Sequence, residues 1–396
     1  MVRDHDDPGP LPADPLRHHG DVETAPGLLD LAVNVQGDAP PRWLRDRLAA
    51  ALDDLAAYPT AAHDAAARES VAARHGRSVE EILVLAGSAE GFAMLPRLRP
   101  VLAAVVHPGF TEPEAVLRDA GVPVARVLTD AADGHRLDPA AVPADADLVV
   151  VGNPTNPTGV LHPAATLRAL ARPGRTLVVD EAFADAVPGE PESLAGDAGV
   201  PGLLVLRSLT KTWALAGLRA GYALGAPKLL ARLAVGRPHW PVGTLVLEAV
   251  KACSEPAAVA AAADAAVRLA AWRATQATAL AAVPGVQVAP GVAPYLLLAL
   301  PAGAGPAVRD RLRATGIAVR RGDTFPGLGP DHVRVAVREP RNRASPPGSP
   351  PPCAPPSPTS PGRPPHDRTA RRRRRPRGRL PATARRRLGR RRPRLR

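Results

Sequence analysis

The chain has 396 residues, of which 45% are hydrophobic and 22% charged, so it can bury a sizeable core in one large domain or two modest ones. Two cysteines, Cys253 and Cys353, exclude a disulfide framework and a zinc site built from cysteines alone, and they suit a reducing cytosol. The formal net charge is +13, but residues 344–396 hold 17 arginines and one aspartate, which leaves −3 for residues 1–343.

The N-terminal residues 1–27 are rich in proline, aspartate and histidine, and they predict a mostly irregular arm. They show neither a signal peptide nor an apolar run of membrane length, so we expect a cytoplasmic protein. A short apolar segment, residues 28–34, ends in an asparagine. Pro40 and Pro41 then open a predicted helix over residues 43–55.

From about residue 64, short strands rich in valine and leucine alternate with helices. Strands are predicted at 82–86, 102–106, 122–128, 147–151, 176–183 and 202–206, and helices at 64–75 and from residues 87, 111 and 163. This alternation predicts an α/β fold with a mainly parallel sheet covered by helices on both faces. Chemistry in such folds gathers at the carboxyl ends of the strands.

An alanine-rich stretch, residues 256–282, predicts a long helix that leads from a large domain (28–255) into a smaller α+β domain (256–343). The smaller domain has predicted strands at 295–299, 317–320 and 332–337 and a helix at 305–315. No internal repeat and no metal-ligand pattern is evident, so we expect no metal site.

After Arg343 the composition changes to proline, serine and arginine with almost no apolar residues, so residues 344–396 cannot bury enough surface to order themselves. One interpretation is an arm that binds nucleic acid or another anionic surface, and another is a plain disordered tail. We favour a third interpretation, a shifted reading frame, because GC-rich codons out of register encode these residue types. Nucleic acid is therefore not an expected partner.

Residues 208–222 follow a predicted buried strand and hold Lys211 at their centre. The chain has only three lysines, and an amine that forms a Schiff base cannot be replaced by arginine, because a guanidinium does not deprotonate. The other two, Lys228 and Lys251, lie in ordinary helical contexts. The segment resembles the lysine segment of fold-type I pyridoxal phosphate enzymes; the alternative is a lysine in a surface turn.

Three further residues suit the same cofactor. Asp180 ends an apolar strand, where a carboxylate is unfavourable unless it is paired, for example with a protonated pyridine nitrogen. Asn156 lies in a doubled Asn-Pro-Thr motif and could donate to a phenolic oxygen, although turn chemistry alone would also explain one asparagine there. Phe110 could stack on a ring, and a core phenylalanine is an equal alternative.

Anion-binding groups follow the same pattern. Ser88 opens a predicted helix whose first N–H groups suit a phosphate, and Ser208 and Arg219 flank the lysine segment on its two sides. Arg334 alternates with valines in an apolar strand, which suits carboxylate binding, unless it faces solvent on an edge strand.

Over residues 28–338 the order and spacing of these motifs resemble the histidinol-phosphate aminotransferase subgroup of the fold-type I pyridoxal phosphate-dependent transferases. The resemblance implies a homodimer with pyridoxal 5'-phosphate at the subunit interface and a small amino acid phosphate as substrate. It assigns the Schiff base to Lys211, the pyridine contact to Asp180, the phenolic oxygen to Asn156, ring stacking to Phe110, phosphate to Ser88, Ser208 and Arg219, the neighbouring subunit's phosphate to Tyr58, the substrate carboxylate to Arg334 and the substrate site to Asn34.

Within that subgroup, threonine-phosphate decarboxylases begin with a His-Gly-Gly element, and His19-Gly20-Asp21 stands at that place. The resemblance therefore predicts decarboxylation of O-phospho-L-threonine in cobalamin biosynthesis, with His19 at the substrate and Arg320-Arg321 as a candidate phosphate site. The alternative is an aminotransferase that acts on histidinol phosphate or a related amino acid. A third hypothesis is a nucleic-acid-binding protein whose enzyme fold is catalytically inactive. The presence of both Lys211 and Asp180 disfavours it.

Overall fold

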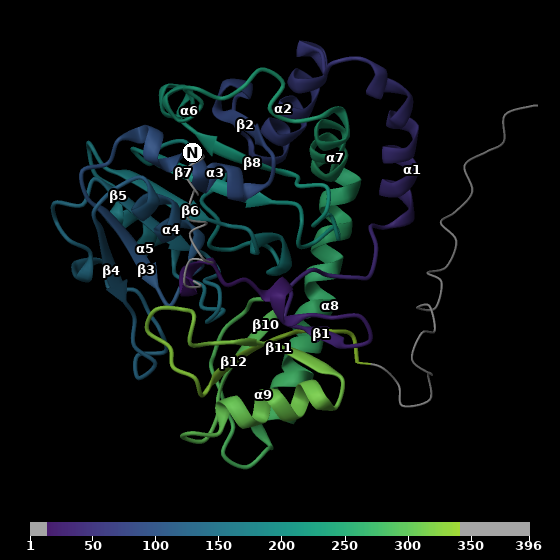
Figure 1. Ribbon diagram of the computed structural model, residues 1–396. Helices are drawn as coiled ribbons and strands as arrows, with labels where there is room; N and C mark the ends of the chain where they lie inside the picture. Colours follow the sequence, from purple (N-terminus) through teal and green to yellow (C-terminus); the bar gives the residue numbers. More distant parts are fainter. Residues whose placement is uncertain (1–13, 341–396) are drawn as a thin grey trace, which may run out of the picture. The chain divides into compact units, whose positions relative to one another are not determined.

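The computed structural model describes residues 14–340, and Figure 1 shows them as two sheets with their covering helices. Residues 1–13 and 341–396 lie outside the described part, and with them the predicted tail (344–396) and the start of the predicted arm. The described part of the arm forms two short 3-10 turns, η1 (Pro15–Arg17) and η2 (Gly20–Glu23).

The larger sheet has seven strands in the order β2-β8-β7-β6-β5-β3-β4. They are β2 (Ile82–Leu85), β3 (Ala103–His107), β4 (Val124–Leu128), β5 (Leu148–Gly152), β6 (Thr176–Asp180), β7 (Leu203–Ser208) and β8 (Gly221–Gly225). Strand β8 is antiparallel to both of its neighbours, and the pairs from β7 to β4 are all parallel. The predicted α/β class with a mainly parallel sheet is confirmed.

Helices cover both faces of this sheet, because each strand sends alternate side chains to opposite faces. In β5, Val149 and Val151 enter the apolar cluster on one face, whereas Leu148 and Val150 enter the cluster on the other. The first face is covered by α2 (Ala61–His75), α5 (Ala164–Leu170) and α7 (Thr244–Ser254), and the second by α3 (Ser88–Met94), α4 (Glu112–Asp119) and α6 (Pro227–Leu233). Burial on both faces explains why the strands are continuously apolar.

The smaller sheet has five strands in the order β1-β11-β12-β10-β9. They are β1 (Leu29–Leu31), β9 (Gln287–Val288), β10 (Tyr295–Ala299), β11 (Ile317–Arg321) and β12 (His332–Ala336), and the helices α8 (Pro256–Ala281) and α9 (Gly305–Ala314) pack on them. Strand β1 pairs in parallel with β11, with Leu29 opposite Ile317. The first residues of the predicted large domain (28–255) therefore join the smaller sheet.

Some elements differ from the prediction, and β9 (Gln287–Val288) is one that was not predicted. The helix predicted over 43–55 is α1 (Arg42–Ala50), followed by the 3-10 helix η3 (Ala51–Ala56). Strand β6 ends at Asp180 rather than at residue 183, because the Ala182 N–H turns back to donate to the Asp180 carboxylate at 3.1 Å. Strand β8 was not predicted, since glycines at both of its ends interrupt the apolar pattern. Gly221 is required there, because a Cβ would lie 2.7 Å from the carbonyl oxygen of Arg207.

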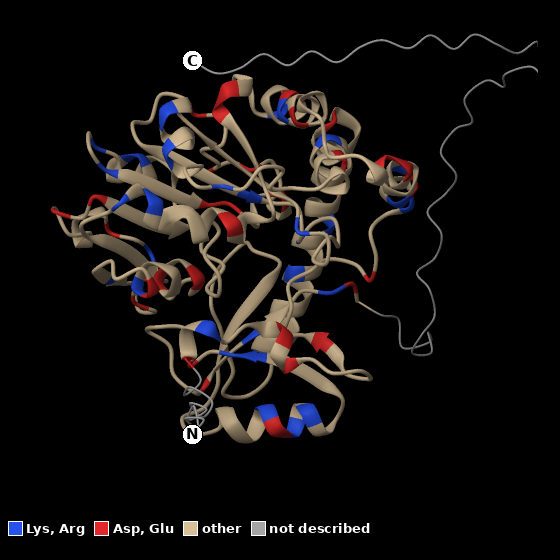
Figure 2. Cartoon of the chain, turned by 45° about the horizontal axis from the view of Figure 1, so that its top comes forward, with Lys and Arg blue, Asp and Glu red and all other residues tan. Residues whose placement is uncertain are grey.

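Charged residues of both signs are interspersed along the helices of the described chain, as Figure 2 shows. Within residues 14–340, the helices are all too short or too polar to cross a membrane. The same residues contain no group of three or more His, Cys, Asp or Glu side chains arranged to hold a metal ion. The cytoplasmic location stays a prediction.

A buried charge cluster lies beside the end of β6. Arg207 on β7 is almost fully buried and donates to Glu181 at 2.9 Å, to Glu190 at 2.6 Å and to Asp185. Arg74 on α2 also donates to Asp185, at 2.8 Å. Although burial alone would raise the pKa of the Asp185 carboxyl, the two guanidinium groups lower it to about 2. The cluster holds the turn that follows Asp180.

Replacing Arg207 by methionine is expected to lower the free energy of unfolding by about 3–5 kcal/mol, because it leaves carboxylates buried without their cation. The control is Arg168→Met, which breaks the half-exposed pair with Asp197 (2.8 Å) and should change stability by no more than about 1 kcal/mol. Urea titrations of both variants measure the difference. Equal losses in the two variants would contradict the assigned role of the cluster.

Candidate active site

A cavity of about 370 Å³ lies at the carboxyl ends of β6 and β7, and strands β11 and β12 of the smaller sheet also contribute side chains to its wall. Its volume suits a small-molecule site. Ten of the eleven predicted site residues line it: His19, Asn34, Ser88, Phe110, Asn156, Asp180, Ser208, Lys211, Arg219 and Arg334. They come from segments more than 300 residues apart, which the two sheets bring together.

Lys211 lies in the loop after β7, and its backbone carbonyl accepts the Gln36 N–H at 2.8 Å. Burial lowers the pKa of its amine to about 8, and the positive charges of Arg334 and Arg219 act in the same direction. A lysine with this pKa has a far larger neutral fraction near neutral pH than an ordinary lysine, so it can act as a nucleophile or a base.

We expect the amine of Lys211 in the cofactor-free protein to react with acetic anhydride with a midpoint near pH 8. The reason is that only the neutral amine attacks the reagent, and burial favours the neutral form. Mass spectrometry of the peptides reports labelling at each of the three lysines, with Lys228 and Lys251 as references in the same samples. A midpoint for Lys211 in the ordinary lysine range, above pH 10, would contradict this prediction.

Asp180 ends β6 at the wall of the cavity. Burial raises the pKa of its carboxyl to about 6, while the N–H of Ala182 and the charge of Lys211 oppose the shift. None of the described cations lies within ion-pair distance of it. A buried carboxylate in this state is strongly stabilised by a cation placed in the cavity next to it.

Asn156 and Arg334 orient each other across the cavity. A guanidinium N–H of Arg334 donates to Asn156 Oδ1 at 2.6 Å, so the amide NH₂ of Asn156 is left as a donor toward the cavity. The Tyr295 hydroxyl donates to the Thr155 carbonyl at 3.0 Å and supports the same loop.

Arg334 itself is buried, 5% exposed, in the central strand β12, so the alternative of a solvent-facing arginine on an edge strand is wrong. It also donates to the Ala32 carbonyl, but no described carboxylate pairs with it and its Nε has no partner. Burial lowers the pKa of its guanidinium to about 9, and the charge of Arg320 adds to the effect. The buried amide of Asn34 likewise has no partner at either atom. These unpaired groups favour a polar, anionic ligand.

Arg320 and Arg321, which we expect to act together, separate in the structure. Arg320 lines the cavity and donates to the His18 carbonyl at 2.6 Å, with its guanidinium 4.7 Å from the ring centre of Phe325. Arg321 is not part of the cavity wall and pairs with Asp323 at 2.5 Å. The prediction of a phosphate site made of both arginines is therefore wrong for Arg321.

A second group of donors gathers where β7, α3 and the lysine loop meet. Ser208 Oγ lies 2.7 Å from Thr210 Oγ1, and the first N–H groups of α3, at Ser88 and Ala89, have no partner inside the helix. Gly87 leaves room for Arg219, since a Cβ there would lie 2.8 Å from its Nη2. This set of hydroxyl, backbone and guanidinium donors suits a phosphate group.

Phe110 lies between Phe92 and His19, with ring centres 5.9 Å and 5.5 Å from its own. His19 Nε2 lies 3.3 Å from Glu112, which also accepts from Arg17 at 3.1 Å. Leu16 is tied to the same helix start, because its carbonyl accepts the Thr111 hydroxyl at 2.6 Å. The arm is thus anchored beside Phe110 at the cavity.

Tyr58 is the predicted site residue that the structure places elsewhere. It is 71% exposed and stacks on Trp240, with ring centres 4.1 Å apart and an angle of 19°. Its predicted contact with a neighbouring subunit stays a prediction. Asp21, Thr210 and Phe325 are among the cavity-lining residues to which the sequence assigned no role. Thr210 could have been predicted as a site residue, because it lies two residues from Ser208 in the lysine motif.

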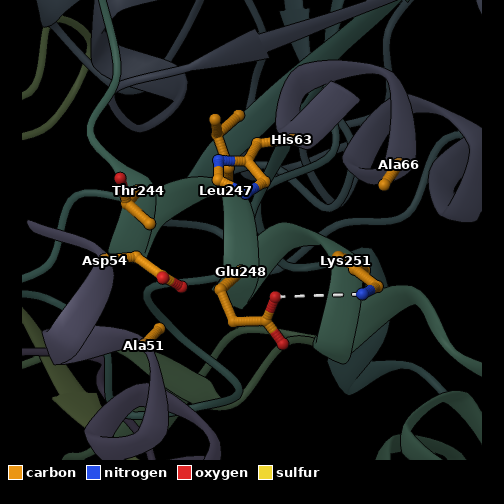
Figure 3. Close-up of a pocket in the computed structure, with 8 residues that line it drawn as sticks. All are labelled: Ala51, Asp54, His63, Ala66, Thr244, Leu247, Glu248 and Lys251. Atoms are coloured by element: carbon orange, nitrogen blue, oxygen red, sulfur yellow. Dashed lines mark ion pairs between the residues drawn. The ribbon is translucent and has the colours of Figure 1, made fainter. Parts of the chain in front are cut away.

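A second hollow, of about 60 Å³, lies between η3, α2 and α7, and Figure 3 shows its eight lining residues. Among them Lys251 and Glu248 approach to 4.0 Å. This hollow has about one sixth of the volume of the larger cavity. The larger cavity is therefore the candidate active site.

Comparison with known proteins agrees with this geometry. Residues 26–343 match the family model described as aminotransferase class I and II. The chain is 56% identical over 332 residues to a histidinol-phosphate aminotransferase of Mycobacterium tuberculosis, covering 84% of this chain and 89% of the relative. The crystal structure of the histidinol-phosphate aminotransferase from Clostridium acetobutylicum shares the fold, with a TM-score of 0.72 at 22% identity, covering 79% of this chain and 95% of that one.

A threonine-phosphate decarboxylase of Salmonella typhimurium is a weaker match, 32% identical over 328 residues, covering 78% of this chain and 87% of the relative. Our prediction of a threonine-phosphate decarboxylase in cobalamin biosynthesis is therefore wrong, because the relatives at 56% identity are aminotransferases by name. The residues around the candidate cofactor site serve both reactions, and so they did not separate the two predictions.

Proposed function

The chain belongs to the class I and II aminotransferase family, and from this premise we propose that it transfers the amino group of histidinol phosphate or a closely related amino compound that carries a phosphate. The observation that carries the choice of substrate is the 56% identity to a histidinol-phosphate aminotransferase over 89% of that relative's length. The protein is an aminotransferase, and pyridoxal 5'-phosphate is its cofactor.

The cavity offers the donors and charges that this cofactor needs. Asp180 supplies a half-buried carboxylate without a described cation at ion-pair distance, and Arg219, Ser208 and the start of α3 supply donors for a phosphate. The free NH₂ of Asn156 suits a phenolic oxygen, and Phe110 offers an aromatic face. The residues present therefore fit the group.

When bound, pyridoxal phosphate supplies an aldehyde that condenses with amines and a ring that accepts electrons from the substrate carbon. Lys211 would hold the aldehyde and would move a proton at the amine-bearing carbon, because burial lowers the pKa of its amine to about 8. Asp180 would hold the proton on the ring nitrogen, and Asn156 would donate to the phenolic oxygen. Ser88, Ser208 and Arg219 would hold the cofactor phosphate.

Histidinol phosphate has no carboxylate, so the buried guanidinium of Arg334 takes the substrate's phosphate instead, together with Arg320. Asn34 and His19 lie at the same cavity and contact the substrate. These assignments explain why two buried arginines have no carboxylate partner among the described residues.

The test is to incubate the purified full chain with pyridoxal phosphate, histidinol phosphate and 2-oxoglutarate, and to measure glutamate. We expect glutamate to form in proportion to the ketone product, and no glutamate without histidinol phosphate. A protein that binds the cofactor but forms no glutamate from histidinol phosphate or related phosphates, at any concentration tried, would overturn the proposal.

We also propose that the enzyme is a homodimer in which Tyr58 reaches the partner's cofactor phosphate. The proposal is supported by exposed apolar side chains at its stacking partner and just before it in the chain: Trp240, Leu52 and Leu55 are each more than half exposed. Such a patch favours burial in an interface. Sedimentation of the 41.2 kDa chain should give twice this mass, and a monomer that is fully active would contradict the proposal.

A further inference from the structure

Asp21 is a carboxylate in the wall of the active-site cavity with no described cation at ion-pair distance. Two nearby acidic residues have basic partners. Glu23 of the arm lies 2.9 Å from His18, and Glu112 at the start of α4 contacts Arg17 and His19. The backbone carbonyl of Asp21 accepts from Thr24, but its carboxylate makes no hydrogen bond within residues 14–340. Its charge is therefore available to a ligand.

The backbone around Asp21 is held firmly, although its side chain is exposed. Gly20 lies so close to the chain after β1 that a Cβ would be 2.6 Å from the Ala32 carbonyl oxygen. On the two sides of this contact, Arg320 donates to the His18 carbonyl at 2.6 Å and Arg313 to the Glu23 carbonyl at 2.7 Å. A fixed polar group in a pocket is what discrimination between ligands requires.

The cavity is otherwise rich in positive charge, with Lys211, Arg219, Arg320 and Arg334 in its wall. Asp21 lies in the same cavity wall as Lys211 and Arg320, and its charge opposes the dominant effect of burial on the pKa of each. A substrate whose amine is at Lys211 and whose phosphate is at Arg320 and Arg334 has one substituent left.

We propose that Asp21 determines substrate specificity: its carboxylate accepts a hydrogen bond from an N–H group on that remaining substituent. The site thereby selects a nitrogen heterocycle such as imidazole over an apolar ring of similar size. This inference rests on the proposed function and deepens it. Asp21 is exposed in the structure, so the discrimination arises when the substrate covers its carboxylate: a substrate that covers it without offering a donor leaves it desolvated and unpaired.

The experiment compares histidinol phosphate with 2-amino-3-phenylpropyl phosphate, which has a phenyl ring in place of imidazole, as amino donors for the wild-type enzyme and Asp21→Ala. The variant should lose at least about 10-fold in kcat/KM for histidinol phosphate, mostly through KM, and stay within about 2-fold for the phenyl compound. Asp21→Asn, which still accepts a hydrogen bond, should retain part of the preference. Glu23→Gln, on the same turn but outside the cavity wall, is the matched control and should change neither.

Equal losses on both substrates in Asp21→Ala would overturn the proposal and indicate a structural role, as would no loss on either. Cofactor absorbance and circular dichroism of the variant establish that it is folded and loaded. If the wild-type enzyme converts both compounds equally well, the aminotransferase function stands and the role of Asp21 falls. If it binds the cofactor but converts neither compound, the proposed function fails, and the specificity proposal with it.

Discussion

Lys211→Ala is expected to lower the rate of amino transfer by at least about 10³-fold, because no other described group can replace its proton transfer at the substrate carbon. Lys211 is one of three lysines in the chain, and it alone lines the cavity. The variant should also lose the absorbance of covalently bound cofactor, since an alanine has no amine to condense with the aldehyde.

Lys211→Arg tests whether the positive charge of Lys211 is sufficient or whether its amine is required. It keeps a cation at the site but cannot condense, because a guanidinium does not deprotonate, so it should be as inactive as the alanine variant. Lys228→Ala and Lys251→Ala are the controls, and both should keep full activity. An active Lys211→Ala enzyme, or loss of the covalent absorbance in Lys228→Ala instead, would show that the assignment of the lysine is wrong.

Asp180→Asn is expected to lower amino transfer by about 10²–10⁴-fold while leaving the protein folded. The isosteric amide has no charge to keep the proton on the ring nitrogen, so the ring accepts electrons less readily. Cofactor affinity, measured by titration of the absorbance, should fall with it. Asp180→Glu restores the charge with altered geometry and should regain part of the rate. A fully active Asp180→Asn would contradict the role.

The same variant has a second readout that needs no cofactor. Burial raises the pKa of Asp180 from 3.8 to about 6, so between these values the folded state keeps a proton that the unfolded chain has lost. The contribution of this group to stability is complete below pH 3.8 and is lost as the pH rises through about 6. In urea titrations of the cofactor-free protein, Asp180→Asn should lack this dependence and be at least as stable as wild type at pH 7. A variant less stable at pH 7 would contradict the unpaired, buried state of Asp180.

Sequence patterns of a few residues correctly predicted strands and helices that can be recognised from their own residues. The valine and leucine runs of β5 and β7 are buried on both faces, and the alanine-rich helix α8 extends over nearly the predicted range. The pairing of β1 with β11 was not predictable in this way, because Leu29 and Ile317 meet only once the whole chain has folded. Strand β8 escaped detection because glycine at both ends is typical of turns.

The site residues likewise fall into two groups: those that motifs predicted, and those that only the folded chain brings together. Lys211, Asp180 and Asn156 stand in motifs at strand ends, so their meeting follows from a parallel sheet. Arg320 and Arg321 are adjacent in the sequence, yet alternation along β11 sends only one of them into the cavity wall. Asp21 stands in the His19-Gly20-Asp21 element, but only the docking of the arm shows that it lines the cavity. The same element led to the wrong prediction of a decarboxylase, because three residues at the substrate do not identify which bond is broken.

The measurement that tests the central claim most directly is a single half-reaction. The protein loaded with pyridoxal phosphate is mixed with histidinol phosphate in the absence of any acceptor, and the cofactor spectrum and the ketone are followed together. We predict that the cofactor passes to its amine form with one ketone released per active site, and that 2-oxoglutarate then restores the starting spectrum. A cofactor spectrum that histidinol phosphate leaves unchanged, with carbon dioxide released from a phosphorylated amino acid instead, would contradict the account.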